Sequence, residues 1–229
     1  DTAPVNEVVP GTVDFDANTS SGGYADLVVT LNMVDGAALK NIRSNGKTLE
    51  ENWQYKVDGS TVTLSKTAVA QFGKDGATYA DFTFVMSKGQ SPTLRVNYVT
   101  TYALTANVVD DLGLPISGAT VTFTPNDAES GTAAQTLVTD SDGKATAYVK
   151  RGSYTLTATH ERFTSAITQT TSVSSGRTVK MTGEILETVQ LVVTNEYGAP
   201  LSGAAVSIGG KTITTGADGT ASFSIKRGS

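Results

Sequence analysis

The chain has 229 residues, no cysteine, a single histidine, and 17 basic against 22 acidic residues, which give a net charge of −5. Without cysteine there are no disulfides, zinc–thiolate sites or cysteine nucleophiles, and one histidine excludes sites that need two imidazoles from one chain. The charge balance gives no basic footprint for nucleic acid, and no apolar run approaches the roughly 18 residues of a membrane span. These limits argue against an enzyme, a cofactor or metal site, a nucleic-acid partner and membrane insertion.

The N-terminal residues 1–12 contain Pro4 and Pro10 and show little alternation, so we expect a linker there. From Tyr24 onward apolar and polar residues alternate, with Leu27 and Leu31 on one side of the chain. This period of two predicts strands with one buried face. The same alternation returns in later runs, which turn-forming Asn-Gly, Asp-Gly and Lys-Gly pairs separate.

The best helical segment is Ser65–Phe72, about two turns long, with Ser65 as its N-cap. No other segment sustains an apolar period of 3.6 residues. Many short strands with frequent turn signals predict an all-β chain of β-sandwiches.

Two later parts of the chain are copies of one another. Gly113–Val121 matches Gly198–Val206, and the four residues that begin at Lys150 recur unchanged from Lys226. The copies differ by nine residues, which fall in the polar stretch 125–134, where a loop tolerates insertion. Asp142-Gly143 is predicted to form a hairpin turn between strands on either side of it.

The second copy ends where the first continues through Tyr154, Leu156, Ala158, Ile167 and finally Met181. It therefore lacks two or three core strands, and its inner face and one edge would be exposed. We expect that the sequence is a fragment. We also expect a neighbouring molecule, or packing on the first copy, to cover the open face.

These patterns divide the chain into a linker (1–12), a first module (13–99), a repeat (102–183) and an incomplete second copy (187–229). We call the two copies repeat A and repeat B. The joints between the parts are only a few residues long and are not rich in Gly, Ser or Pro. They cannot serve as long flexible tethers, so we expect a semi-rigid string of sandwiches.

The first module resembles the type-two X modules, immunoglobulin-like domains of cellulosomal scaffoldins and secreted bacterial glycoside hydrolases. The segments that carry the resemblance are Phe15-Asp16, Asp26–Leu31, Leu39–Ile42, Asn45-Gly46, Tyr55, Thr61–Ser65, Phe82–Phe84 and Leu94–Val96. The resemblance implies an immunoglobulin-like sandwich and a link to polysaccharide or cell-wall attachment and to spacing.

Repeats A and B resemble carboxypeptidase regulatory-like domains and the related collagen-adhesin B repeats, which are transthyretin-like sandwiches. The segments that carry this resemblance are Leu104–Val109, Pro115–Val121, Thr139–Gly143 and Gly152–Leu156. The motif is specific for the fold and not for a function. Both resemblances together imply an exported bacterial protein, extracellular or on the cell surface.

Aromatic residues are the candidates for glycan contact, because sugar rings stack on flat apolar faces. Trp53 and Tyr55 would share a strand face, and the X-module pattern assigns Tyr55 to the core and leaves Trp53 open. Glycan binding would need an exposed aromatic strip, so Trp53 and nearby Tyr24 or Tyr79 must be accessible to solvent.

Oxygen-bearing side chains alternate at Asp14, Asp16 and Asn18, as at the start of a calcium loop. A calcium-binding helix–loop–helix would need Gly and Glu where this chain has Thr19 and Ala25. We therefore interpret the three residues as a polar strand edge and turn.

The leading functional interpretation is a non-catalytic stalk that presents another domain of an exported protein. The alternative is a carbohydrate- or cell-wall-binding module, with binding on the first module at Trp53, Tyr24 and Tyr79. An enzyme would need a convergent polar pocket, for which the sequence offers no residues.

Overall fold

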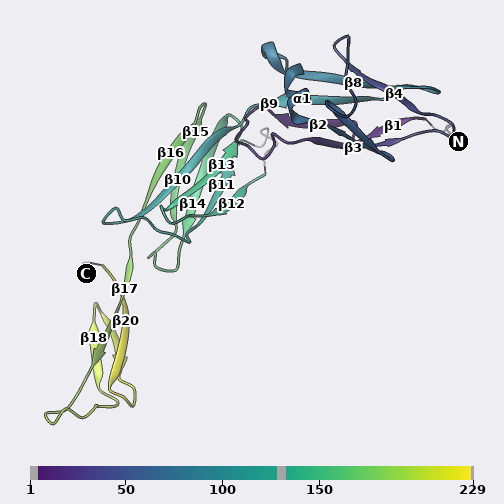
Figure 1. Cartoon of the computed structure of the whole chain (residues 1–229). Helices are drawn as coiled ribbons and strands as arrows, with labels where there is room; N and C mark the ends of the chain where they lie inside the picture. The colour runs from purple at the N-terminus through teal and green to yellow at the C-terminus, as the bar shows by residue number, and fades with distance from the viewer. Residues whose placement is uncertain (1–4, 128–132, 228–229) are drawn as a thin grey trace. The chain divides into compact units, whose positions relative to one another are not determined.

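Period-two alternation places most of the chain in β-strands, so the all-β prediction is confirmed. The structure is a computed structural model that describes residues 5–127 and 133–227. It divides into two compact units, Asp1–Tyr102 and Ala103–Ser229. Figure 1 labels elements of both units.

The first unit is a sandwich of two sheets. One sheet has the order β1-β3-β7-β6 and the other the order β2-β9-β8-β4-β5. Strand β2 runs parallel to β9, and the other neighbouring strands of these two sheets run antiparallel. The elements are β1 (Glu7–Val9), β2 (Thr12–Asp16), β3 (Leu27–Asn32), β4 (Leu39–Ser44), β5 (Lys47–Thr48), β6 (Tyr55–Asp58), β7 (Thr61–Leu64), α1 (Lys66–Phe72), a 3-10 turn (Lys74–Gly76), β8 (Tyr79–Met86) and β9 (Thr93–Val99).

The core of this unit lies between the inward faces of the two sheets, where Phe15, Phe82 and Phe84 are fully buried. Burial of each such side chain stabilises the fold by about 1.5–3 kcal/mol. The predicted helix is confirmed as α1, and the Ser65 hydroxyl accepts a hydrogen bond from Ala68 N at 3.2 Å. This short helix needs tertiary support, and Phe72 packs edge-on against Phe82 with centroids 5.2 Å apart.

The prediction of a linker over residues 1–12 is wrong for its later part. β1 pairs with β3, and Val8 is 4% exposed within the core. The buried Asn6 side chain donates to the carbonyl oxygens of Lys88 and Gln90, both at 2.8 Å. The segment therefore closes one edge of the sandwich, and residues 1–4 lie outside the described residues.

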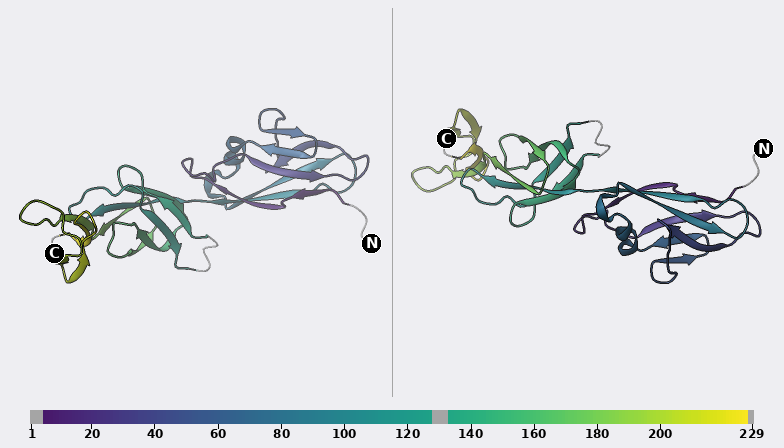
Figure 2. Two further views of the ribbon diagram at one scale, coloured as in Figure 1. Left: turned by 90° about the horizontal axis from the view of Figure 1, so that it is seen from below. Right: turned by 90° about the horizontal axis from the view of Figure 1, so that it is seen from above.

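Repeat A, in the second unit, also has two facing sheets, which can be followed in the two views of Figure 2. Their orders are β13-β10-β16, with β10 and β16 parallel, and β12-β11-β14-β15. The strands are β10 (Tyr102–Asp110), β11 (Thr120–Pro125), β12 (Gln135–Val138), β13 (Lys144–Val149), β14 (Gly152–Thr159), β15 (Ile167–Val173) and β16 (Arg177–Gly183).

Repeat B reproduces only part of this architecture in the described residues. It contains β17 (Leu186–Val192), β18 (Ala205–Ile208), β19 (Lys211–Thr214) and β20 (Thr220–Lys226). Here β17 pairs with β20 and β18 with β19, whereas in repeat A the equivalent β10 and β11 also pair with β16 and β14. Leu104 of repeat A is fully buried, and its counterpart Val189 is only half-buried, so the inner face of repeat B stays partly open.

The nine-residue difference between the copies falls in one connection. Phe123 pairs with Gln135 in repeat A, and Ile208 pairs with Lys211 in repeat B. Eleven residues therefore separate the first pair and two separate the second, so the prediction of an insertion in this stretch is confirmed. Residues 128–132 lie outside the described part of the chain.

The turn at Asp142-Gly143 is present, but the prediction of a hairpin is wrong. β12 and β13, on either side of the turn, belong to different sheets of repeat A. Gly143 has φ +72°, and its carbonyl accepts a hydrogen bond from Val108 N at 2.7 Å. The turn thus passes the chain from one layer to the other and is held against β10.

Candidate functional site

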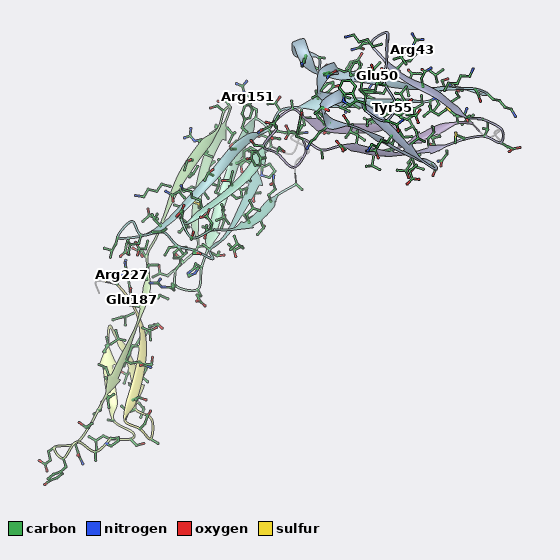
Figure 3. The ribbon with its side chains drawn as sticks, in the orientation of Figure 1. Arg43, Glu50, Tyr55, Arg151, Glu187 and Arg227 are labelled. Carbon is green, nitrogen blue, oxygen red and sulfur yellow. The ribbon has the colours of Figure 1, made fainter. Side chains whose placement is uncertain are left out.

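Trp53 lies in the tight turn that joins β5 to β6 and crosses between the two sheets of the first unit. Glu50 and Gln54 close this turn, since Gln54 N donates to Glu50 O and Glu50 N donates to Gln54 Oε1, both at 2.8 Å. The Trp53 side chain is 68% exposed, whereas Tyr55, at the start of β6, is 3% exposed in the core. Glu50 and Tyr55 are labelled in Figure 3. The turn therefore holds an indole ring toward solvent on a fixed backbone.

Tyr79 is the first residue of β8 and lies on the outer face of the five-stranded sheet, 50% exposed. The Arg95 guanidinium sits 4.3 Å from the centre of its ring and makes two hydrogen bonds of 2.8 Å to the Asp81 carboxylate. The hydrogen bond from Arg95 is the main reason that the pKa of Asp81 lies below its usual value. Because both charged side chains are well exposed, solvent screens the pair and it adds little to stability.

Tyr24 is half-buried and belongs to the edge of the core. Its ring packs against Phe15 with centroids 5.4 Å apart, and the Lys66 ammonium lies 5.6 Å from its centre. One face of this ring is therefore used in packing.

The three aromatic candidates come from different elements and do not form a strip. Within the described residues no ring contact joins any two of them. What the structure assembles is a lone indole at Trp53 and, on the sheet face, the group Tyr79–Arg95–Asp81, which borders a shallow depression also lined by Arg43.

Sequence reasoning missed Arg95 and Asp81, although a signal was present. The β8–β9 register places Asp81 opposite Arg95. Alternation along each strand could have put these two residues and Tyr79 on one face, but only after the register was known.

Asp16 and Asn18 hold the end of the first unit. The Asp16 carboxylate accepts hydrogen bonds from Asn18 N at 3.0 Å, Thr101 N at 3.2 Å and Thr101 Oγ1 at 2.5 Å, and it is 4% exposed. Asn18 Nδ2 donates to Thr101 O at 3.0 Å. Among the described residues, no group of three or more His, Asp or Glu side chains is arranged to hold a metal ion.

Two family models match successive parts of the chain. Residues 8–96 match the carbohydrate binding domain X2, and residues 103–184 match the carboxypeptidase regulatory-like domain. In the described part of the chain, no helix has the length and apolar character needed to cross a membrane.

Among curated proteins, cellulose-binding protein A of Clostridium cellulovorans is 35% identical over 92 residues, which are 40% of this chain and 5% of that protein. Among solved structures, a tri-modular endo-β-1,4-glucanase of Bacillus halodurans aligns over 72% of this chain and 35% of its own, with 15% identity and a TM-score of 0.36. A streptococcal ancillary pilin aligns over 75% of this chain and 68% of its own, with 12% identity and a TM-score of 0.35.

The matches confirm the resemblance of the first module to X modules and of repeat A to carboxypeptidase regulatory-like domains. The chain carries a carbohydrate binding domain X2 match followed by a carboxypeptidase regulatory-like match.

Proposed function

We propose that this chain is a non-catalytic accessory part of an exported bacterial protein and acts as a semi-rigid spacer that presents another domain. The observation that carries the proposal is the connection after β9. Only two residues separate β9 from β10, and one of them, Thr101, is hydrogen-bonded to Asp16 and Asn18. A connection so short and so firmly held by one unit leaves little length for free swivelling.

Small-angle X-ray scattering of the chain tests the spacer proposal. We expect a pair-distance distribution with two separate maxima. One comes from distances within each unit and the other from a preferred distance between the two units. The control carries about twelve Gly and Ser residues inserted between Thr101 and Tyr102, which keeps the Thr101 hydrogen bonds to Asp16 and Asn18. This linker should smear those features because such linkers behave as random coils. If the unaltered chain already gives the smeared curve of the control, the spacer is not semi-rigid.

A second candidate function is polysaccharide contact through Trp53, favoured by the 68% exposure of its side chain on a hydrogen-bonded turn. Residues 8–96 match a carbohydrate-binding family, and the curated relative is named for cellulose binding. Exposed large aromatic residues are the usual anchors of a contact surface. The ligand would be a neutral glycan, bound by stacking rather than by charge.

Affinity electrophoresis in gels containing soluble cellulose derivatives, xylan or peptidoglycan fragments checks this function. We expect retardation in at least one gel and its loss in Trp53→Ala, with affinity falling about tenfold or more. Tyr79→Ala is the matched control, because that ring is also exposed but already carries Arg95 on it. Equal retardation of Trp53→Ala and the unaltered chain would remove Trp53 from any binding site.

The edges of β17 and β18 that lack a paired strand among the described residues remain a proposed contact surface for further polypeptide. Exposed strand edges offer unpaired N–H and C=O groups to another strand. Repeat B contacts repeat A where the two repeats join, near residues 184–186 and Arg227.

A further inference from the structure

Arg227, just after β20 of repeat B, contacts three carboxylates. Its guanidinium lies 3.0 Å from Asp110, the last residue of β10 in repeat A, and 2.9 Å from Asp111, the next residue. It also lies 2.8 Å from Glu187 on β17. We call this group the Arg227 clasp, and Arg227 and Glu187 are labelled in Figure 3. The Asp110 side chain is only 3% exposed, so the clasp includes a buried charge that needs a partner.

Comparison of the two repeats shows that the loop needs the side-chain oxygen of Asp110 as a hydrogen-bond acceptor but does not need its charge. Asp110 Oδ1 accepts hydrogen bonds from Leu112 N at 2.9 Å and Leu114 N at 2.8 Å. In repeat B the equivalent residue is Asn195, whose amide oxygen accepts the same two bonds, from Tyr197 N at 3.0 Å and Ala199 N at 2.9 Å. The turn therefore works with a neutral oxygen, and the charge of Asp110 is left for Arg227.

The charge state of Asp110 agrees with this assignment. Burial alone would raise the pKa of its carboxyl group, but hydrogen bonds from Leu114 N, Arg227 and Leu112 N outweigh burial and hold the pKa below its usual value. The carboxylate is therefore ionised at neutral pH and available to the guanidinium.

A second attachment lies between the same two repeats at residues 184–186. Thr164 N donates to Glu184 O at 3.0 Å, and Leu186 N donates to Arg162 O at 2.7 Å. Ile185, between them, is fully buried. One such tether would leave repeat B free to turn about it. The Arg227 clasp adds ion pairs from the residue that follows β20, whose backbone N also donates to Ile185 O at 3.0 Å. These added contacts restrict that rotation.

We propose that the Arg227 clasp docks repeat B onto the acidic loop of repeat A, so that the two repeats move as one body. The partner that fits the Asp110-Asp111 loop is thus the arginine that follows β20 of the next repeat. This inference does not depend on the proposed spacer role or on glycan binding.

Distance measurement between two spin labels in the full chain tests the proposal. The chain lacks cysteine, so Val138→Cys on β12 and Ser222→Cys on β20 place one label on each repeat at exposed sites. We expect a narrow distance distribution with Arg227 present. Arg227→Gln should raise about tenfold the fraction of molecules in which repeat B is undocked and the label distance is broadly distributed. An increase of this size is expected for loss of charged hydrogen bonds.

Two further variants make the result specific. Asp110→Asn should broaden the distribution while the Leu112 and Leu114 amides keep their protection from hydrogen exchange, because an asparagine supports this turn in repeat B. Arg151→Gln changes the exposed arginine at the same position of repeat A and should leave the distribution narrow. The clasp is refuted if Arg227→Gln stays as narrow as the unaltered chain, or if Arg151→Gln broadens it equally.

Discussion

Gly143→Ala is expected to destabilise repeat A by about 3 kcal/mol or more, because both its backbone conformation and its surroundings require glycine. Gly143 has φ +72°, and a Cβ atom there would lie 2.4 Å from Val108 O and 3.1 Å from Ile116 N. These are backbone atoms, so relief requires β10 to move. The movement would also disturb the hydrogen bond from Val108 N to Gly143 O, which holds the turn between the sheets.

Hydrogen exchange of the β10 and β13 amides in the full chain measures this loss. Gly113→Ala is the matched control, since Gly113 has φ +82° with no atom within 4 Å of the added carbon. It should cost only the strain of positive φ, about 1–2 kcal/mol. Equal loss of protection in the two variants would show that close approach to Val108 is unimportant.

Asp16→Ala is expected to lower the stability of the first unit by about 2–4 kcal/mol, because it removes a buried carboxylate that accepts three hydrogen bonds. The variant would leave Asn18 N and both donors of Thr101 without this acceptor. In differential scanning calorimetry the transition of this unit should fall by roughly 10 °C or more, since each kcal/mol shifts the midpoint of a small domain by several degrees.

The control is Asp14→Ala, two residues earlier on the same strand. Asp14 is exposed and accepts a hydrogen bond from Asn97 Nδ2 at 3.2 Å. A surface change of this kind should alter stability by about 0.5 kcal/mol or less. A similar fall in the midpoint for both variants would mean that the Thr101 contacts contribute little.

Local signals in the sequence were enough for some features. Ser65 before an apolar stretch predicts the start of α1 because a hydroxyl can satisfy a free helix N–H, and that bond is present. Tyr55 and Trp53 are two residues apart, yet one is in the core and the other is exposed. The family pattern assigned Tyr55 to the core. The structure gives the physical reason for the difference: β6 begins only at Tyr55, so the strand alternation does not extend back to Trp53.

Other features depend on pairing across the chain, which alternation cannot specify. Strand β1 is three residues long, too short to show a period, and its place is set by pairing with β3. At Gly143 the turn was clear from its residues, but the choice of separate sheets for β12 and β13 comes from packing of the whole repeat. The Arg95–Asp81 pair likewise required the β8–β9 register.

The unequal connection between β11 and β12 and its counterpart in repeat B has a practical consequence. The same strand pair closes over two residues in one copy and over eleven in the other, a difference in loop-closure entropy of only about 1.5 kcal/mol. Replacing the Gly209-Gly210 turn with a foreign peptide of about eleven residues should therefore be tolerated. This position is thus suitable for displaying epitopes or binding peptides.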